Sequence, residues 1–191
     1  MTPPPTRGTA AMPMRIRSVH TSDLTAAELD AVRSLMDAAF DDFTDDDWDH
    51  TVGGMHALVL DEDGAVLAHG SLVQRRLLHG GRALRTGYVE GVAVRADRRR
   101  RGHASAVMAT LERVLRDGAY ELGALGAADE AVPLYRGRGW QPWHGPLSVL
   151  APTGLHRMPE EAGGIFVLPV NGTRVDTAGE LTCDWRPGDV W

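Results

Sequence analysis

The chain has 191 residues, a formal net charge of −6 and 43% hydrophobic residues. This length suits one well-packed domain and argues against two independent cores. A single cysteine, Cys183, excludes an intrachain disulfide, and no Cys/His cluster has the spacing of a structural zinc site. No stretch reaches the roughly 20 apolar residues of a membrane-spanning helix. We therefore expect a protein of the reducing cytoplasm, without a metal or a membrane partner.

Residues 1–14 combine Pro, Thr and Gly without a continuous apolar stretch, which predicts a flexible leader rather than a secretory signal. We expect residues 15–191 to form a single domain, because neither a repeat nor a linker interrupts them.

The predicted elements alternate along the chain. Thr25 and Glu28 have capping-box spacing at the start of a helix over 25–40. Strand-like runs at 55–60, 65–78 and 83–94 predict an antiparallel meander. An amphipathic helix follows from Gly102 to near Gly118, and a strand at 119–125 comes next. Asp129 could cap a short helix that ends at Gly139, and the remaining strands are predicted at 147–151, 164–170 and 180–185.

Charge is concentrated in two short segments. Residues 41–49 contain six aspartates around Phe43 and Trp48, whereas 98–101 are four consecutive arginines. Either run alone is typical of a solvated loop. Together they indicate a cationic ligand at one place and an anionic ligand at another. Net acidity argues against general nucleic-acid binding, which needs a broad basic face.

The arginine run continues into a short motif. Arg99, Gly102 and Ala104 form R-x-x-G-x-A between a predicted strand and a predicted helix, where small residues and exposed helix amides favour phosphate. The arginines would add charge-assisted contacts to a pyrophosphate. A Rossmann fingerprint and a P-loop are both absent. By itself this motif is a weak signal.

Several longer strings carry a specific resemblance: FTDDDWDHTVGGMHAL, LVQRRL, ALRTGYVEGVAVRAD, LYRGRGWQPWHGP, SVLAPTG and CDWRPGDVW. In this order they resemble the aminoglycoside 2'-N-acetyltransferases of the GNAT superfamily, from about residue 20 onwards. The resemblance implies an α+β GNAT acyltransferase fold, with a mixed, mostly antiparallel central sheet flanked by helices. It also implies acetyl-CoA-dependent transfer to the 2'-amino or 2'-hydroxyl group of an aminoglycoside, antibiotic resistance, and a homodimer.

The resemblance implies two catalytic residues. Glu90 would be the general base, acting through a water, although from the sequence alone a solvent-facing strand position is equally compatible. Tyr135 would protonate the departing thiolate, and its alternative role is packing beneath a helix.

The donor would lie along the strand and the turn after it. Gly91 is a candidate for a bulge that frees strand amides, and amides near Val92 could polarise the thioester carbonyl. Among the arginines, Arg99 and Arg101 are favoured over Arg98. The predicted donor-binding residues are Val92, Ala93, Val94, Arg99, Arg100, Arg101, Gly102, His103 and Ala104.

A polycationic acceptor calls for carboxylates. The candidate substrate-binding residues are Asp42, Asp47, Glu90, Gly91, Gly126, Glu160, Glu161, Asp189 and Trp191. Trp191 could add its own α-carboxylate if the tail folds back into the cleft, the alternative being a frayed terminus. Gly126 replaces a serine of the family pattern, and Glu160 and Glu161 replace aspartates.

Other interpretations remain open. His56, His69 and His144 are expected to be packed or capping histidines rather than acid–base groups, and Trp140 and Trp143 to be core or dimer contacts rather than a base-stacking platform. The acceptor could instead be a polyamine, a peptide amine, or a cell-wall or thiol precursor. A module that binds CoA or nucleic acid without catalysis is a third possibility, which the presence of both Glu90 and Tyr135 disfavours.

Overall fold

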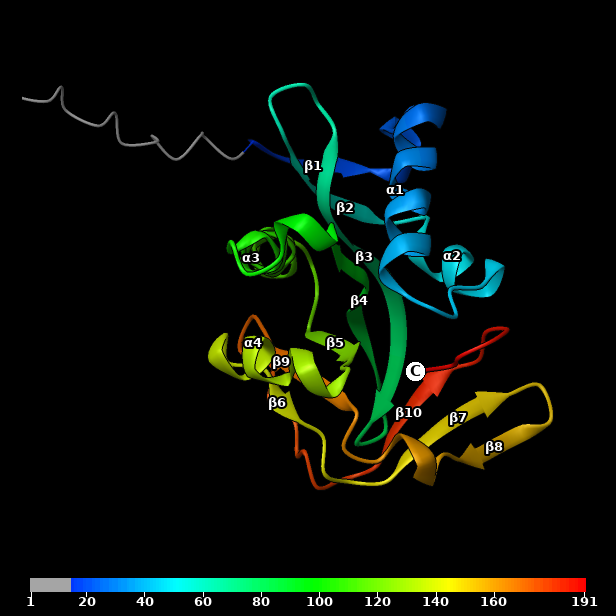
Figure 1. Ribbon diagram of the computed structural model, residues 1–191. Coiled ribbons are helices and arrows are strands. Elements are labelled where there is room, and N and C mark those ends of the chain that lie inside the picture. Colours follow the sequence, from blue (N-terminus) through cyan, green and yellow to red (C-terminus); the bar gives the residue numbers. More distant parts are fainter. Residues whose placement is uncertain (1–14) are drawn as a thin grey trace, which may run out of the picture.

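The computed structural model describes residues 15–191, and the predicted leader at 1–14 lies outside the described residues. A long sheet curls through the molecule, with α1 and α2 on one side and α3 and α4 on the other (Figure 1). The helices are α1 (Ala26–Ala39), α2 (Asp45–Thr51), α3 (His103–Asp117) and α4 (Val132–Gly137). The strands are β1 (Arg15–His20), β2 (Met55–Leu60), β3 (Val66–His79), β4 (Arg82–Val94), β5 (Leu122–Gly126), β6 (Gln141–Pro142), β7 (Leu147–Ala151), β8 (Gly154–Arg157), β9 (Ile165–Pro169) and β10 (Leu181–Asp184).

The sheet has the order β6-β9-β5-β4-β3-β10-β7-β8, and β2 pairs with both β3 and β1. Only β4–β5 and β10–β7 are parallel among the pairs within residues 15–191. The predicted meander is β2, β3 and β4, and it is confirmed as antiparallel. The α+β fold with a mixed, mostly antiparallel sheet is therefore confirmed.

Helix α1 begins where the capping box predicted. The Thr25 Oγ1 accepts a hydrogen bond of 3.3 Å from the Glu28 backbone N–H, and the Glu28 carboxylate accepts one of 2.8 Å from the Thr25 N–H. Its buried residues Val32, Leu35 and Met36 recur at helical spacing and face the sheet.

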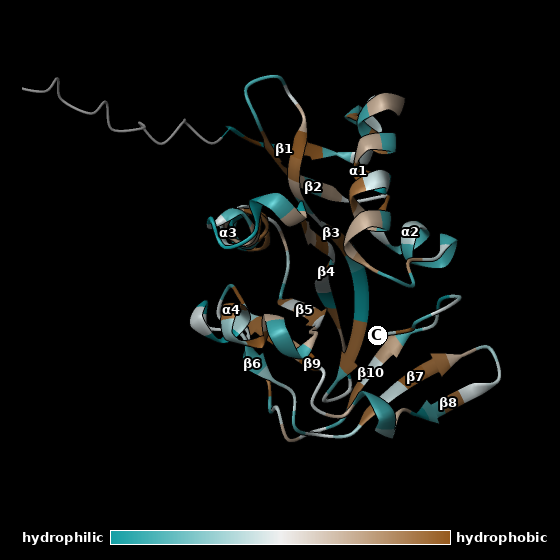
Figure 2. Cartoon of the chain, in the orientation of Figure 1, coloured by the Kyte–Doolittle hydropathy of each residue, from teal (hydrophilic) through white to brown (hydrophobic). Residues whose placement is uncertain are grey.

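The acidic run is not a loop throughout, which corrects the sequence interpretation. Residues Asp45–Thr51 form α2, because Thr44 and Asp47 make a second capping box at its N-terminus. Three aspartates in the first turn also interact favourably with the helix dipole. Figure 2 shows α2 as a hydrophilic helix at the edge of the fold.

The predicted cap at Asp129 is wrong. Asp129 belongs to a 3-10 turn, Asp129–Ala131, and α4 starts after it with Pro133 in its first turn. A buried ion pair ties the end of α4 to α3: the Arg138 Nε and Nη2 donate to the two carboxylate oxygens of Glu112, at 2.7 and 2.8 Å. Trp140 donates to the same carboxylate at 3.0 Å.

The core follows the two-residue period of the strands. On β2, Ala57 and Val59 pack in the cluster that contains α3, whereas Leu58 and Leu60 pack with α1. A further cluster under β7, β9 and β10 contains Trp143 and Trp191. Trp140 and Trp143 are 2% and 1% exposed, so both are core residues and neither offers a stacking platform.

Among residues 15–191, no helix has the length and apolar character needed to cross a membrane. In the same range, no three His, Cys, Asp or Glu side chains are grouped so that they could hold a metal ion.

Candidate active site

Strands β4 and β5 separate within the sheet. Their parallel pairing extends from Thr86–Leu122 to Tyr88–Ala124 and then stops, although β4 continues to Val94. On the other side of β4, the register with β3 shifts between His69 and Ser71, which is the predicted bulge. The β4 segment beyond Tyr88 therefore has one edge that β5 does not cover.

Gly91 at the bulge has a φ of +55°, which a side chain rarely adopts. A Cβ at this position would also lie 2.8 Å from the Met36 Cε of α1. The backbone conformation therefore favours glycine next to Glu90, whereas the Met36 methyl group, at the end of a flexible side chain, can shift.

A cavity of about 880 Å³ opens where β4 and β5 separate. It reaches from the strand to the start of α3, where Gly102 precedes the helix with a φ of +82° and makes no side-chain cap to the first helical amides. Such amides favour a phosphate group. Of the predicted donor-binding residues, those that line the cavity are Val92, Ala93, Val94, Arg99, Arg100, Gly102, His103 and Ala104.

The arginine run contributes to this cavity only in part. Arg99 and Arg100 line it, whereas Arg98 and Arg101 are not among its lining residues. Arg98 instead lies 3.5 Å from the Asp97 carboxylate. The preference for Arg99 and Arg101 over Arg98 stays a prediction, and of the predicted arginines it is Arg99 and Arg100 that line the cavity.

A second cavity of about 530 Å³ adjoins the first and is lined by Asp42 and Asp47. Glu90, Gly91, Asp189 and Trp191 line both cavities. Asp47 has a structural role as well, because its Oδ2 accepts hydrogen bonds of 2.8 Å from both the N–H and the hydroxyl of Thr44.

Glu161 lines the larger cavity, and its pKa is raised by burial and by the nearby carboxylates of Asp189 and Glu160. Glu160 is exposed and is not among the residues that line either cavity in the described part of the chain. The structure therefore brings together all of the predicted acceptor residues except Glu160.

Glu90 is held inside the protein at the junction of the two cavities. Its side chain is only 15% exposed and pairs with the Arg186 guanidinium at 2.5 Å. Burial raises the pKa of Glu90, Asp189 adds to that rise, and the charges of Arg186 and Arg75 oppose it. A carboxyl group with these neighbours is poised for proton transfer.

Tyr135 projects from α4 into the larger cavity. Burial raises its pKa to about 12, so the hydroxyl is protonated at neutral pH. Its ring centroid lies 6.3 Å from that of Trp140, which Glu112 anchors to α3. Tyr135 thus packs against Trp140 and also lines the larger cavity, so its position is compatible with a role beyond packing.

The C-terminal segment folds back into the site, as the aromatic tail predicted. Trp191 is 5% exposed, and its main-chain N–H donates a hydrogen bond to the Asp189 Oδ1 at 3.3 Å. Gly126 at the end of β5 faces this segment: a Cβ there would lie 3.9 Å from the Trp191 main-chain oxygen and 4.0 Å from the Tyr88 hydroxyl. The position of the absent serine is therefore open toward the site.

Two buried histidines support the bulge from behind. Because the Gly91 carbonyl can only accept, the His69 Nδ1 donates to it, at 3.0 Å. The His69 Nε2 then accepts from the His56 Nδ1 at 2.8 Å, and the His56 Nε2 accepts from the Thr21 hydroxyl at 2.7 Å. Burial lowers the pKa of His56 to about 4 and that of His69 to about 3. Both are packed, neutral histidines, as predicted, whereas His144 lies exposed in a loop and is not packed.

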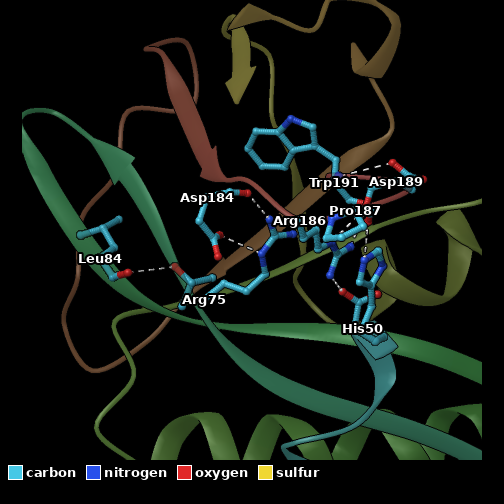
Figure 3. A network of polar contacts seen from close by, with 10 residues as sticks. His50, Arg75, Leu84, Asp184, Arg186, Pro187, Asp189 and Trp191 are labelled. Carbon is cyan, nitrogen blue, oxygen red and sulfur yellow. Dashed lines mark hydrogen bonds and ion pairs between the residues drawn. The ribbon is translucent and has the colours of Figure 1, made fainter. Parts of the chain in front are cut away.

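Sequence reasoning assigned no role to Arg186 or Tyr88, and it did not predict that His56 and His69 form a hydrogen-bonded pair. Arg186 lies inside the string CDWRPGDVW. Nothing in the neighbouring residues indicates that this arginine contacts Glu90, and a site for cations would not be expected to contain an arginine. Figure 3 shows Arg186 with Asp189 and Trp191 of the folded-back tail.

Comparisons with known proteins agree with this geometry. Residues 20–143 match the family model described as an acetyltransferase (GNAT) domain. The structure is similar to a GNAT family N-acetyltransferase (YhbS) from Escherichia coli in complex with CoA, with a TM-score of 0.64, 15% identity, and coverage of 95% of this chain and 94% of that one. A GNAT family acetyltransferase from Brucella melitensis in complex with acetyl-CoA has a TM-score of 0.59 and 16% identity, over 88% of this chain and 94% of that one. The chain therefore belongs to the GNAT acetyltransferase family.

A relative from Mycolicibacterium fortuitum is more specific. It is an aminoglycoside 2'-N-acetyltransferase and is 55% identical over 179 residues, which cover 92% of this chain and 91% of the relative. This relative confirms the resemblance that the sequence strings indicated.

Proposed function

We propose that the protein transfers the acetyl group of acetyl-CoA to the 2'-amino group of an aminoglycoside. The observation that carries the proposal is the place of Glu90, at the junction of a cavity bordered by arginines and a cavity bordered by aspartates. The identity to the Mycolicibacterium fortuitum enzyme supports the choice of acceptor. It favours this acceptor over a polyamine, a peptide amine, or a cell-wall or thiol precursor.

The larger cavity suits the donor. The uncovered edge of β4 at Val92, Ala93 and Val94 offers main-chain groups to the pantetheine amides, because β5 does not pair there. The N-terminus of α3, where Gly102 makes no side-chain cap, would hold the pyrophosphate together with Arg99 and Arg100. When bound, acetyl-CoA supplies a thioester whose acetyl carbon is open to attack by an amine.

The smaller cavity suits a polycation. Asp42, Asp47 and Asp189 line it, and Glu161 faces the adjoining cavity. Carboxylates in this arrangement complement the ammonium groups of an aminoglycoside. Trp191 also lines this cavity, although most of its side chain is packed in the core.

The chemistry divides between two side chains. Glu90, acting through a water, takes a proton from the 2'-ammonium group, so that the neutral amine can form the new C–N bond. The N–H groups near Val92 stabilise the negative charge that develops on the acetyl oxygen. As the C–S bond breaks, Tyr135 gives its hydroxyl proton to the sulfur, and it regains a proton from solvent.

The proposal is tested by thiol release from acetyl-CoA with two aminoglycosides that differ only in an amino or a hydroxyl group at the 2' position. We expect turnover with the 2'-amine. Glu90→Gln should lower kcat/KM by about 10²- to 10⁴-fold, the usual contribution of a general base, while CoA binding is retained. Arg82→Gln is a matched control, because Arg82 pairs with Glu121 on the surface, away from both cavities.

Turnover with amines that lack an aminoglycoside ring, and none with the 2'-amine, would instead support an acetyltransferase for another small amine. Salt-sensitive DNA binding without acetyl-CoA turnover would support the non-catalytic alternative.

Three finer expectations belong to the same proposal: antibiotic resistance, a homodimer and a cytoplasmic location. Resistance is tested by the inhibitory concentration of a 2'-amino aminoglycoside in cells that express the wild type or Glu90→Gln. The oligomeric state is tested by sedimentation of the purified protein, and the location by cell fractionation.

A further inference from the structure

Arg186 is a cation placed inside a cleft that is otherwise acidic. It follows β10 and lines the smaller cavity together with Asp42 and Asp47. Its side chain is only 13% exposed, so water does not screen its charge effectively. An arginine here would repel an ammonium group, and its presence therefore calls for a reason other than acceptor binding.

The guanidinium of Arg186 joins three groups. Its Nη1 donates to the Glu90 Oε1 at 2.5 Å, its Nε to the Asp189 main-chain oxygen at 2.9 Å, and its Nη2 to the Trp191 main-chain oxygen at 3.4 Å. Its Cζ lies 5.5 Å from the centre of the Tyr88 ring, which adds a cation–π contact. One side chain thus connects the candidate base to both acceptor residues of the tail, and Figure 3 shows Arg186 beside Asp189 and Trp191.

Other charged groups face the same carboxylate but are engaged elsewhere. Arg75 of β3 donates to the Asp184 Oδ1 at 2.9 Å and to its main-chain oxygen at 2.8 Å. Asp189 of the tail is negative and therefore acts against ionisation of Glu90. Arg186 is the one cation among the described residues that forms an ion pair with Glu90.

The elements on the remaining sides provide no substitute. On α2, the His50 Nε2 is 2.8 Å from the Pro187 carbonyl, and burial lowers the pKa of His50, which favours its neutral form. On β4, Tyr88 has a raised pKa and is neutral. Asp47 of α2 is negatively charged and therefore cannot stabilise the ionised form of Glu90. Without Arg186, burial would therefore favour the protonated form of Glu90.

We propose that Arg186 is the positioning residue of the catalytic base, because it keeps Glu90 ionised near neutral pH and clamps the tail that carries Asp189 and Trp191. The inference rests on the proposed function, since Glu90 is a base only if the acceptor is an amine. A carboxyl group must lose its own proton before it can take one from the ammonium group, and Arg186 makes this possible in a buried place.

The two parts of this role are separated by two variants. Arg186→Gln removes both the positive charge and the planar set of guanidinium N–H donors. Arg186→Lys keeps the positive charge but loses that set of donors. The acid limb of the pH profile of kcat/KM for the aminoglycoside should move up by about one pH unit or more in Arg186→Gln, since loss of a nearby opposite charge raises a carboxyl pKa by that amount. In Arg186→Lys the limb should stay close to that of the wild type.

Hydrogen exchange of the amides at 188–191 reports the clamp independently of activity. We expect faster exchange in both Arg186 variants, because both lose contacts to the main-chain oxygens of Asp189 and Trp191, and wild-type exchange in the Arg82→Gln control. An unchanged acid limb in Arg186→Gln would overturn the role in ionisation, and unchanged exchange in both variants would overturn the clamp. Wild-type enzyme without aminoglycoside turnover would overturn the proposed function alone, and the exchange measurement would still decide the clamp.

Discussion

The buried pair His56 and His69 makes acid stability a sensitive test of the structure. Both side chains are 0% exposed, and both pKa values lie below the ordinary 6.5, at about 4 and about 3. Below pH 6.5 the unfolded chain therefore binds protons that the folded chain does not. The stability due to the neutral pair is present above pH 6.5 and is lost as the pH falls.

The size of the loss follows from these values. At about pH 5 the unfolded chain gains about 2 kcal/mol from protonation of each histidine, so the folded state loses about 4 kcal/mol relative to about pH 8. This is a large share of the roughly 5–15 kcal/mol that stabilises a typical domain. Protonation of His69 in the folded chain would break the hydrogen bond between the two histidines, because the His69 Nε2 accepts from the His56 Nδ1 and a protonated nitrogen cannot accept.

Urea unfolding followed by tryptophan fluorescence at a series of pH values measures this loss. Changing His56 and His69 to Gln keeps amide donors and acceptors but removes the titration, so the double variant should lose about 4 kcal/mol less than the wild type over this range. His156→Gln is the control, because His156 is exposed. The raised pKa values of Glu90 and Glu161 act in the opposite sense, but they are common to all variants and cancel in the difference.

Each variant is compared with its own stability at about pH 8, so a general destabilisation by the substitution does not confuse the result. If the double variant lost as much stability as the wild type between about pH 8 and pH 5, the histidines would not be buried as a neutral pair, and the reasoning would be refuted.

Two further predictions concern the site. Gly126→Ser should change the free energy of unfolding by less than about 0.5 kcal/mol, because a Cβ there has no contact closer than 3.9 Å. It should lower KM for the aminoglycoside by about 3- to 10-fold, the value of one added hydrogen bond, without changing KM for acetyl-CoA; equal changes in both would contradict a contact to the acceptor. Tyr135→Phe should keep the fold, since no hydrogen bond to the Tyr135 hydroxyl is present among residues 15–191, and should lower kcat by about 10²-fold in the thiol-release assay; a wild-type kcat would remove Tyr135 from the mechanism.

Most of the helices and strands were predictable because their signals are local. The capping box of Thr25 and Glu28 defined the start of α1, and the apolar run at 55–60 is β2 with the same bounds. Helix α2 has a similar cap at Thr44 and Asp47, but its lack of an apolar face made the acidic run read as a loop. Strands β1, β6 and β8 were missed, since their residues do not form a distinct apolar run.

Within the site, Glu90, Tyr135 and the turn of Arg99 and Gly102 came from motifs, and the structure places each of them against the larger cavity. Arg186 could not be identified from a motif, because its role depends on a contact with Glu90, which lies 96 positions away in the sequence. The preference for Arg99 and Arg101 over Arg98 meets the same limit, since the order of four arginines says nothing about which of them a turn directs toward the cavity.

The sequence by itself determined the family and most of the strands and helices, and it supplied the candidate residues for acetyl transfer, because capping boxes, periodicity and motif strings are encoded over a few neighbouring positions. Tertiary structure alone decided the electrostatic state of those residues. The return of the tail to β4 places Arg186 on Glu90, and the pairing of β2 with β3 buries His56 against His69. Burial and ion pairing set a pKa, and both depend on which distant segments the fold brings into contact.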